Sequence, residues 1–253
     1  MAHDLSSLNP TGRFSNRVDN YVKFRPSYPE AIITFFREQF GLQPSHLVAD
    51  IGSGTGLFAE LLLKQGYRVT GVEPNDEMRA AGEAYLSTYK QFNTVKGTGE
   101  QTNLADHSVD LITVAQAFHW MEPQATRAEF LRVLKPGGHI ALIWNLRLKN
   151  TPFLKAYDEL KNEFSTDYST TGRDNPSTLA AFFAPDTMHV NIFPYEQPMD
   201  FEAVKGQLLS ASYMPLAGQP GHEDMIQALT NLFDTHQQNG TITMAYETKV
   251  YWH

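Results

Sequence analysis

The sequence contains no cysteine, which excludes disulfide bonds, thiolate metal ligands and a cysteine nucleophile. It also lacks any run of about 18 apolar residues, the length that a membrane-spanning helix needs. The first stretch, "MAHDLSSLNPTGRFSNR", has none of the apolar core of a secretory signal. We therefore expect a cytoplasmic protein that does not enter a membrane.

Positive charge is also scarce, because 20 basic residues stand against 28 acidic ones, for a net charge of −8. This balance opposes broad electrostatic binding to nucleic acid or to an anionic membrane surface. We expect a small-molecule partner, no nucleic acid, and a monomer or homodimer. The 253 residues, 42% hydrophobic and 19% charged, are enough for one domain with a substantial core.

The clearest pattern in the sequence is an alternation of apolar strand-like runs with helical segments between about Leu47 and Leu148. Strands are predicted at "HLVADIG", "YRVTGVE", "FNTVKGTGE", "VDLITVAQAF" and "HIALIWNLR". Helices are predicted at "GLFAELLLKQG", "NDEMRAAGEAYLSTY" and "PQATRAEFLRVL", the last of which is stopped by "KPGG". This alternation predicts an α/β fold with a doubly wound, mostly parallel sheet that helices cover on both faces.

The pattern divides this single domain into four parts. Residues 1–44 precede the first predicted strand and are free to cover the carboxyl ends of the strands as an N-terminal helical lid. Residues 45–148 are the alternating core, and residues 149–190 are an insert, where the alternation fails and substrate specificity is expected. Residues 191–253 complete the sheet: "MHVNIFPYEQPM" predicts a strand broken by prolines, and "TITMAYETKVYW" predicts a final strand.

A glycine-rich turn, "VADIGSGTGLF", joins the first predicted strand to the first helix of this core. Such a turn lets a ligand approach backbone N–H groups at a helix N-terminus without intervening side chains. A dinucleotide-binding fingerprint would need glycine where Leu57 stands, which weakens a nicotinamide interpretation. No G-K-[ST] follows, so a P-loop with its phosphate-binding lysine is absent.

The stretch from Asp50 to Gly56 resembles D-x-G-x-G-x-G, the first motif of class I methyltransferases that use S-adenosylmethionine, at every fixed position. "VDLITVAQAFHWM" and "FLRVLKPGGHIALIWN" resemble later motifs of that superfamily. "YVKFRPSYP", "AQAFHW" and "YETKVYW" resemble its type 11 branch, which includes trans-aconitate methyltransferase-like proteins. The resemblance implies a Rossmann-like, seven-stranded sheet and S-adenosylmethionine as the cofactor.

Glu73 ends the second predicted strand, 73 − 50 = 23 residues after Asp50, where an acidic side chain can accept hydrogen bonds from both hydroxyls of a ribose. "GTGE", from Gly97 to Glu100, stands where such enzymes contact adenine. Asp50 is expected to orient the glycine turn through backbone N–H groups rather than to touch the cofactor. The cofactor residues that the resemblance implies are Asp50, Gly52, Ser53, Gly54, Gly56, Glu73, Pro74, Met78, Thr98, Gly99, Glu100, Ala115, Gln116, Ala117, Tyr21 and Arg25.

Methyl transfer from a sulfonium requires alignment and exclusion of water, and it needs a base only when the acceptor is not already ionised. His119, just beyond the fourth strand, is the candidate base, and the alternative is a histidine that packs beside Trp120 and shapes the pocket. We expect O-methylation of a small carboxylate or similar acceptor that Arg25 or Arg147 holds. The expected substrate residues are Tyr28, His119, Trp120, Trp144, Arg147 and Tyr213. No metal site is expected, because the histidines show no ligand spacing.

Two other functions stay open at this point. One is a domain that binds the cofactor without turnover and acts through a partner, which a sequence does not exclude. The other is a nicotinamide-dependent oxidoreductase, which Leu57 and the lack of a Y-x-x-x-K pair disfavour. "AQAF" stands where amino-methylating relatives carry D/N-P-P-Y/F, so adenine and glutamine acceptors are also disfavoured.

Overall fold

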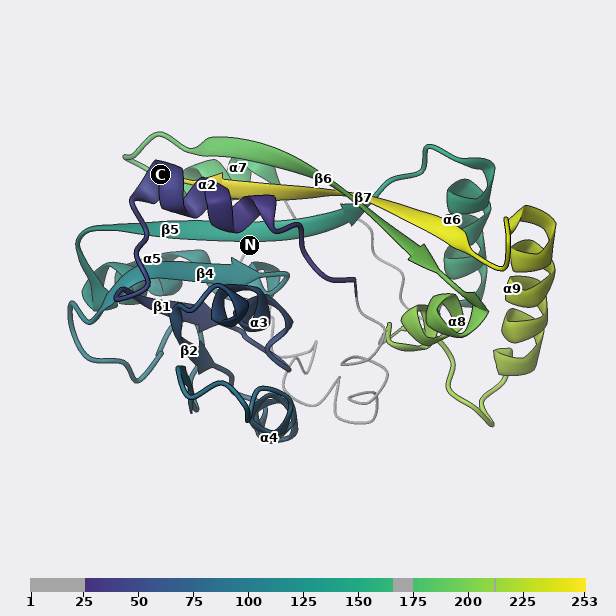
Figure 1. Ribbon diagram of the computed structural model, residues 1–253, viewed down its shortest axis with the longest axis horizontal. Coiled ribbons are helices and arrows are strands. Elements are labelled where there is room, and N and C mark those ends of the chain that lie inside the picture. Colours follow the sequence, from purple (N-terminus) through teal and green to yellow (C-terminus); the bar gives the residue numbers. More distant parts are fainter. Residues whose placement is uncertain (1–25, 166–174, 212) are drawn as a thin grey trace.

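The structure, a computed structural model, describes residues 26–165, 175–211 and 213–253 (Figure 1). Its strands are β1 (Leu47–Ile51), β2 (Arg68–Val72), β3 (Phe92–Val95), β4 (Val109–Ala115), β5 (Leu134–Arg147), β6 (His189–Met199) and β7 (Ile242–Trp252). Its helices are α2 (Ala31–Phe40), α3 (Leu57–Lys64), α4 (Asp76–Tyr85), the 3₁₀ helix η3 (Phe118–Trp120), α5 (Pro123–Val133), α6 (Pro152–Phe164), α7 (Pro176–Phe183), α8 (Phe201–Leu209) and α9 (His222–His236). None of the helices in these ranges combines the length and apolar composition that crossing a membrane requires.

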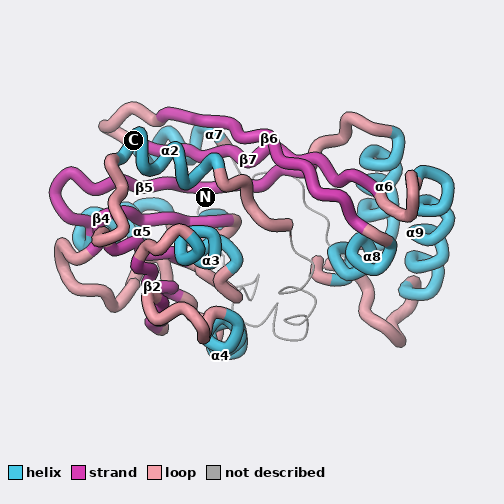
Figure 2. Tube along the Cα trace, in the orientation of Figure 1, coloured by secondary structure: helices cyan, strands magenta, loops and turns pink. Residues whose placement is uncertain are grey.

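The strands form one seven-stranded sheet in the order β3-β2-β1-β4-β5-β7-β6 (Figure 2). The first five strands in chain order pair in parallel, and β7 runs antiparallel to both of its neighbours, β5 and β6. This confirms the predicted doubly wound, mostly parallel α/β sheet of the Rossmann-like class. Since the carboxyl ends of β1, β2 and β4 share one edge, the segments that follow these strands meet there.

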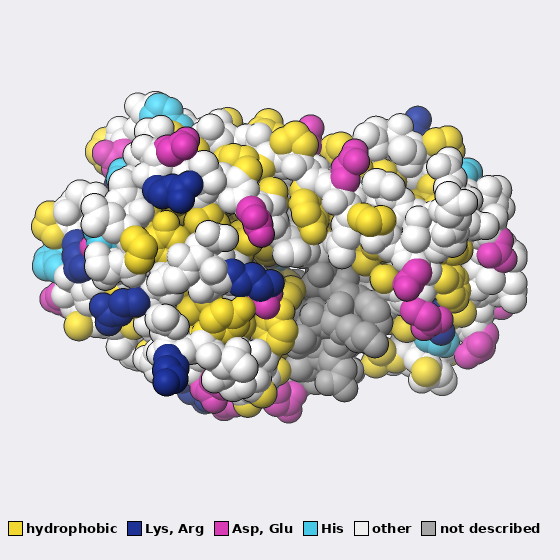
Figure 3. Space-filling view, in the orientation of Figure 1, with side chains coloured by type: hydrophobic (Ala, Val, Ile, Leu, Met, Phe, Trp, Pro, Cys, Tyr) yellow, Lys and Arg dark blue, Asp and Glu magenta, His cyan; other side chains and the backbone are white. Residues whose placement is uncertain are grey.

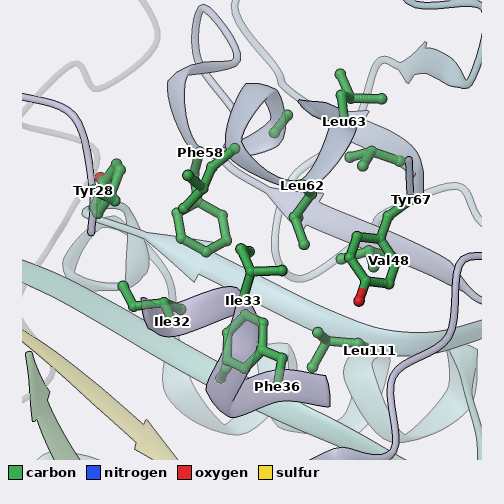
Figure 4. Close-up of a cluster of buried hydrophobic side chains, with 14 of the residues drawn as sticks. Tyr28, Ile32, Ile33, Phe36, Val48, Phe58, Leu62, Leu63, Tyr67 and Leu111 are labelled. Carbon is green, nitrogen blue, oxygen red and sulfur yellow. The ribbon is translucent and has the colours of Figure 1, made fainter. Parts of the chain in front are cut away.

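Helices cover both faces of the sheet, so its central strands are apolar on both sides. One face packs against α2 and α3, where Ile32, Phe36, Phe58 and Leu62 surround Val48 of β1 (Figure 4). The other face packs against α5 and α7 and forms a second buried cluster. The two layers hold β1 and β4 in place beneath the glycine turn.

Three helices form a separate lobe at one end of the sheet. β5, β6 and β7 extend beyond the other strands, and α6, α8 and α9 pack around their extensions (Figure 1). Side chains such as Leu154, Leu208 and Leu229 fill the centre of this lobe. The lobe therefore has its own apolar core, and β5 connects it directly to the central sheet.

Three expectations need correction. Ala31–Phe40, within the predicted lid, is a core helix that buries Ile32 and Phe36 against the sheet, and residues 1–25 lie outside the described residues. "KPGG" does not separate α5 from the fifth strand, because β5 already begins at Leu134. β6 is not broken by Pro194 and Pro198, because an edge strand can turn positions that lack an N–H away from its neighbour.

Candidate active site

The glycine turn after β1 makes a tight bend at the edge of the sheet. Gly52, Gly54 and Gly56 have φ angles of 68°, 56° and 85°, in the left-handed region that favours glycine. The Gly52 N–H donates to the Val72 carbonyl over 2.8 Å, which ties the turn to the end of β2. Gly56 is the N-cap of α3, so the turn delivers the chain directly into a helix N-terminus.

The three glycines differ in how much space surrounds the position of a Cβ atom. A Cβ atom at Gly52 would lie 2.5 Å from the Ala117 Cβ, and one at Gly56 would lie 2.5 Å from the Leu86 Cδ1. These two positions are therefore restricted by packing within the protein. A Cβ at Gly54 would meet nothing nearer than 3.4 Å, so this glycine leaves open space on the cleft side of the turn.

Glu73 locks the turn to the second strand. One carboxylate oxygen, Oε2, accepts the Gly54 N–H over 2.9 Å, and the other, Oε1, accepts the Asn75 N–H over 2.9 Å. The Asn75 Oδ1 in turn caps α4 by accepting the Met78 N–H over 2.8 Å. Burial raises the pKa of Glu73, while the hydrogen bonds from Asn75 and Gly54 and the nearby Arg79 oppose this rise. Each oxygen of an ionised carboxylate can accept a second hydrogen bond, so Glu73 retains capacity for ligand hydroxyls.

Asp50 lies beneath the turn and is 1% exposed. Its Oδ1 accepts a hydrogen bond from the Thr113 hydroxyl of β4 over 2.8 Å, and its Oδ2 has no hydrogen-bond partner within the described part of the chain. The expectation that Asp50 orients the turn through backbone N–H groups is wrong, because the turn's Gly54 N–H goes to Glu73. Burial raises the pKa of Asp50 to about 7; Thr113 lowers it, and repulsion from Glu73 raises it further.

A second turn follows β3. The Thr98 N–H donates to the Gln101 carbonyl over 2.9 Å, and the Thr98 hydroxyl accepts the Gln101 N–H over 3.2 Å. Glu100 accepts the Glu122 N–H over 2.7 Å, which fastens this turn to the start of α5. The predicted adenine segment thus forms a wall whose shape is fixed by hydrogen bonds of its own.

The end of β4 forms the opposite wall. Gln116 has a φ of 61°, unusual for a residue other than glycine, and its N–H and side-chain amide donate to the carbonyls of Ile143 and Asn145. η3 follows, with Phe118 buried in the core. This local geometry brings Trp120 to the cleft.

These walls enclose a cleft at the carboxyl ends of β1, β2 and β4. It is lined by Gly52, Gly54, Glu73, Pro74, Asn75, Met78, Thr98, Gly99, Glu100, Ala115, Gln116, Ala117, Trp120 and Met121. All of them except Asn75, Trp120 and Met121 were predicted from the sequence as cofactor residues, and Trp120 as a substrate residue. Three other predicted cofactor positions do not line the cleft, since Asp50, Ser53 and Gly56 belong to β1 and its turn. Tyr21 and Arg25, also predicted, lie outside the described residues.

Sequence reasoning missed Asn75 and Met121. Asn75 follows Glu-Pro and precedes the acidic first turn of α4, which is an N-cap signal that could have identified it. Met121 packs against Gly99, since a Cβ at that glycine would lie 2.5 Å from the Met121 Sδ. Nothing in the local pattern around Met121 indicates that contact.

The structure does not bring the predicted substrate residues together. Trp144 is 0% exposed and packs edge-on against Phe118 and Tyr251 in the core, so its predicted place in the pocket is wrong. Tyr28 is also buried in the core, with its ring 5.1 Å from that of Phe58.

The remaining predicted substrate residues lie near or beyond the cleft. His119 is partly buried and does not line the cleft, but its ring lies 4.8 Å from that of Trp120, which does. Arg147 pairs with Asp158 of α6 over 3.3 Å, in the direction of the helical lobe. Tyr213 is buried in that lobe, with the Lys161 ammonium 5.3 Å from its ring.

The sheet, the glycine turn and the acid that ends β2 define an α/β domain of the Rossmann-like class. In the ranges that the structure covers, no three His, Asp or Glu side chains cluster as ligands for a metal ion.

Known proteins are similar to this chain over part of its length. Residues 49–142 match the family model described as a methyltransferase domain. An uncharacterized methyltransferase of Mycobacterium tuberculosis is 35% identical over 147 residues, which cover 58% of this chain and 58% of the relative. An uncharacterized methyltransferase-like protein of Schizosaccharomyces pombe is 27% identical over 155 residues, 61% of this chain and 59% of the relative. The matches thus span a little over half the length of these relatives.

A solved structure from Anaeromyxobacter dehalogenans, named as a candidate type II methyltransferase, aligns with a TM-score of 0.66 at 21% identity. The alignment covers 90% of this chain and 97% of that one, and at this identity it establishes the fold. Together, these comparisons show that residues 49–142 are similar to a methyltransferase domain and that the chain shares the fold of the solved structure.

Proposed function

We propose that the protein transfers the methyl group of S-adenosylmethionine to a small-molecule acceptor, and that the cofactor binds in the cleft beside the glycine turn. One observation carries this proposal. Gly54 leaves open space on the cleft side of the turn, and Glu73, which holds that turn, faces the same cleft with two oxygens that can each accept a further hydrogen bond. The residues present therefore fit the cofactor.

The chain's own groups have distinct roles in this proposal. Glu73 accepts hydrogen bonds from the ribose hydroxyls, and the turn from Thr98 to Glu100 bounds the adenine. Trp120 and Met121 form an apolar wall that excludes water. When bound, S-adenosylmethionine supplies a methyl group on a positively charged sulfur, to which an electron-rich acceptor must be aligned.

The acceptor, in our proposal, is a small anionic molecule that is methylated on oxygen, as in trans-aconitate methyltransferase-like proteins. Arg147 supports this assignment because it lies on β5 close to the cleft wall. It follows Asn145 by two residues, and the Asn145 carbonyl accepts a hydrogen bond from the side-chain amide of Gln116, which lines the cleft. Arg147 and Lys149 both pair with Asp158, which places two cations together at this point. A carboxylate acceptor would be attracted to these cations.

A screen of small carboxylic acids, phenols and amines for uptake of labelled methyl tests the proposal. We expect turnover with carboxylic acids. Arg147→Met should raise the acceptor KM on any hit, with little change in cofactor affinity. Turnover confined to amines or to nucleic acid would contradict the acceptor assignment and leave the cofactor assignment standing. No turnover with any class would favour a domain that binds the cofactor without catalysis.

A further inference from the structure

β6 is the last strand of the sheet, so its outer edge has no neighbouring strand among the described residues. The first half of this strand, His189–Phe193, carries no Asp, Glu, Lys or Arg. Val190 is 49% exposed and Ile192 is 51% exposed, both more than Leu131 at 41%. Exposed strand edges in monomeric proteins are usually blunted by charge or proline, and this half has neither.

The two prolines of β6 show which way its backbone groups point. A proline has no N–H to give to a neighbouring strand, so Pro194 and Pro198 occupy positions whose backbone groups point away from β7. The side to which the backbone N–H and C=O groups point alternates from one residue to the next along a strand. Val190 and Ile192 are each an even number of residues from these prolines, so their groups point to the same side. Their N–H and C=O groups therefore point to the open edge, whereas the prolines remove the donors from the second half.

The other face of this edge is aromatic. Phe193 lies 5.6 Å from Phe35 of α2, and His189 stacks on Trp252 of β7 at 4.7 Å between ring centroids. Phe35, Phe193 and Trp252 are only partly buried. Hydrophobic side chains, interspersed with acidic ones, follow the upper rim of the view in Figure 3, over β6. Both faces of the edge therefore offer apolar surface.

The two exposed apolar residues of this edge, Val190 and Ile192, flank Asn191. An antiparallel strand placed with its own Asn191 opposite this residue sets Val190 against Ile192 and Ile192 against Val190. Each of these pairs has outward backbone groups, so each exchanges two hydrogen bonds, and on one face valine meets isoleucine. From this two-fold register we infer that a second copy of the chain pairs with the His189–Phe193 half of β6 to form a homodimer.

Such an interface is isologous, because the same five residues serve both copies. The cleft lies at the ends of β1, β2 and β4, on the opposite side of β5 and β7 from β6, so both clefts stay accessible. Five-residue pairing with an aromatic rim belongs at the smaller end of specific interfaces, so dimerisation should depend on protein concentration. The inference does not depend on the proposed function, since it concerns a different surface.

Sedimentation equilibrium of the full chain over a range of concentrations tests this homodimer. The wild type should show reversible dimerisation. Ile192→Lys should weaken it roughly tenfold or more, because a lysine on an open edge opposes strand pairing. Leu131→Lys is the matched control, since Leu131 is similarly exposed on α5, and it should dimerise like the wild type.

Circular dichroism melts establish that both variants are folded, and hydrogen exchange adds an independent measurement. The amides of Val190 and Ile192 should become more protected as protein concentration rises. A wild type that stays monomeric at every concentration would overturn the inference. So would an Ile192→Lys protein that dimerises as tightly as wild type, an equal loss in Leu131→Lys, or protection that does not change with concentration.

Discussion

Replacing Asp50 by asparagine should remove most of the loss of stability with rising pH that arises at the base of the glycine turn. Burial raises the pKa of Asp50 from 3.8 to about 7. Because the folded state holds this proton more tightly than the unfolded state does, the stabilisation is fully present below about pH 4 and is lost as pH rises towards 7. A rise in this pKa from 3.8 to about 7 corresponds to about 4 kcal/mol of unfolding free energy.

Asparagine keeps an oxygen that can accept the Thr113 hydroxyl, but it does not titrate. Its buried amide would lack an acceptor where Oδ2 now lies, at a cost of about 1–3 kcal/mol. Asp50→Asn should therefore be within about 1 kcal/mol of the wild-type stability at about pH 5, and more stable than wild type at about pH 8 by roughly 1–3 kcal/mol. Burial also raises the pKa of Glu73. The unfolding free energy of the variant should therefore still fall as pH rises, but less steeply than that of the wild type.

Urea unfolding at several pH values from about 5 to 8 measures this difference. Asp110→Asn is the matched control. Burial acts to raise the pKa of Asp110, but the hydrogen bonds from Lys135 and Leu47 hold it below its usual range. Asp110 therefore stays ionised over the whole interval, and its variant should keep the wild-type slope. An Asp50→Asn protein with that same slope would refute the account of Asp50.

Three further substitutions test other parts of the site. Glu73→Ala should weaken binding of S-adenosylhomocysteine, measured by calorimetry, by about 1.5–3 kcal/mol, since hydrogen bonds to a charged group are lost; unchanged affinity would contradict the ribose assignment. Gly52→Val should lower the melting temperature more than Gly54→Val does, because the new side chain meets Ala117; equal losses would count against the packing argument. His119→Gln should slow methylation of an ionised acceptor by roughly tenfold or less, and a loss of about 10²–10⁴-fold in steady-state rate would instead make His119 a base.

Much of the lining of the cleft was predictable because its signals are local. The turn between β1 and α3 and the acid at the end of β2 follow from strand and helix patterns and from glycine's conformational freedom. Trp144 was misplaced for a physical reason: both faces of β5 are covered by helices, so alternation along the strand does not tell a core position from a pocket position. The position of α2 in the core could not be read from its sequence, because an amphipathic helix does not specify which surface buries it.

The positions of the predicted substrate residues depend on long-range packing, which the sequence does not display. Arg147 and Tyr213 are far apart in the chain, and the helical lobe that brings them to one end of the sheet is built from α6, α8 and α9. The edge position of β6 was similarly hidden, since its prolines suggested an interruption when they instead mark the unpaired side of a continuous strand. Chain order alone did not reveal that β7 lies between β5 and β6.

The most direct test of the central claim is calorimetric titration of S-adenosylmethionine and S-adenosylhomocysteine into the wild type, Gly54→Val and Gly41→Val. Gly54 and Gly41 both have left-handed φ angles, 56° and 61°, and both have room for a Cβ, but Gly41 ends α2 and does not line the cleft. The two variants should therefore share the backbone strain and differ at the cleft. We predict that the wild type and Gly41→Val bind with similar affinity and that Gly54→Val, although folded, does not bind. Failure of the wild type to bind either ligand, or unchanged affinity in Gly54→Val, would contradict the account.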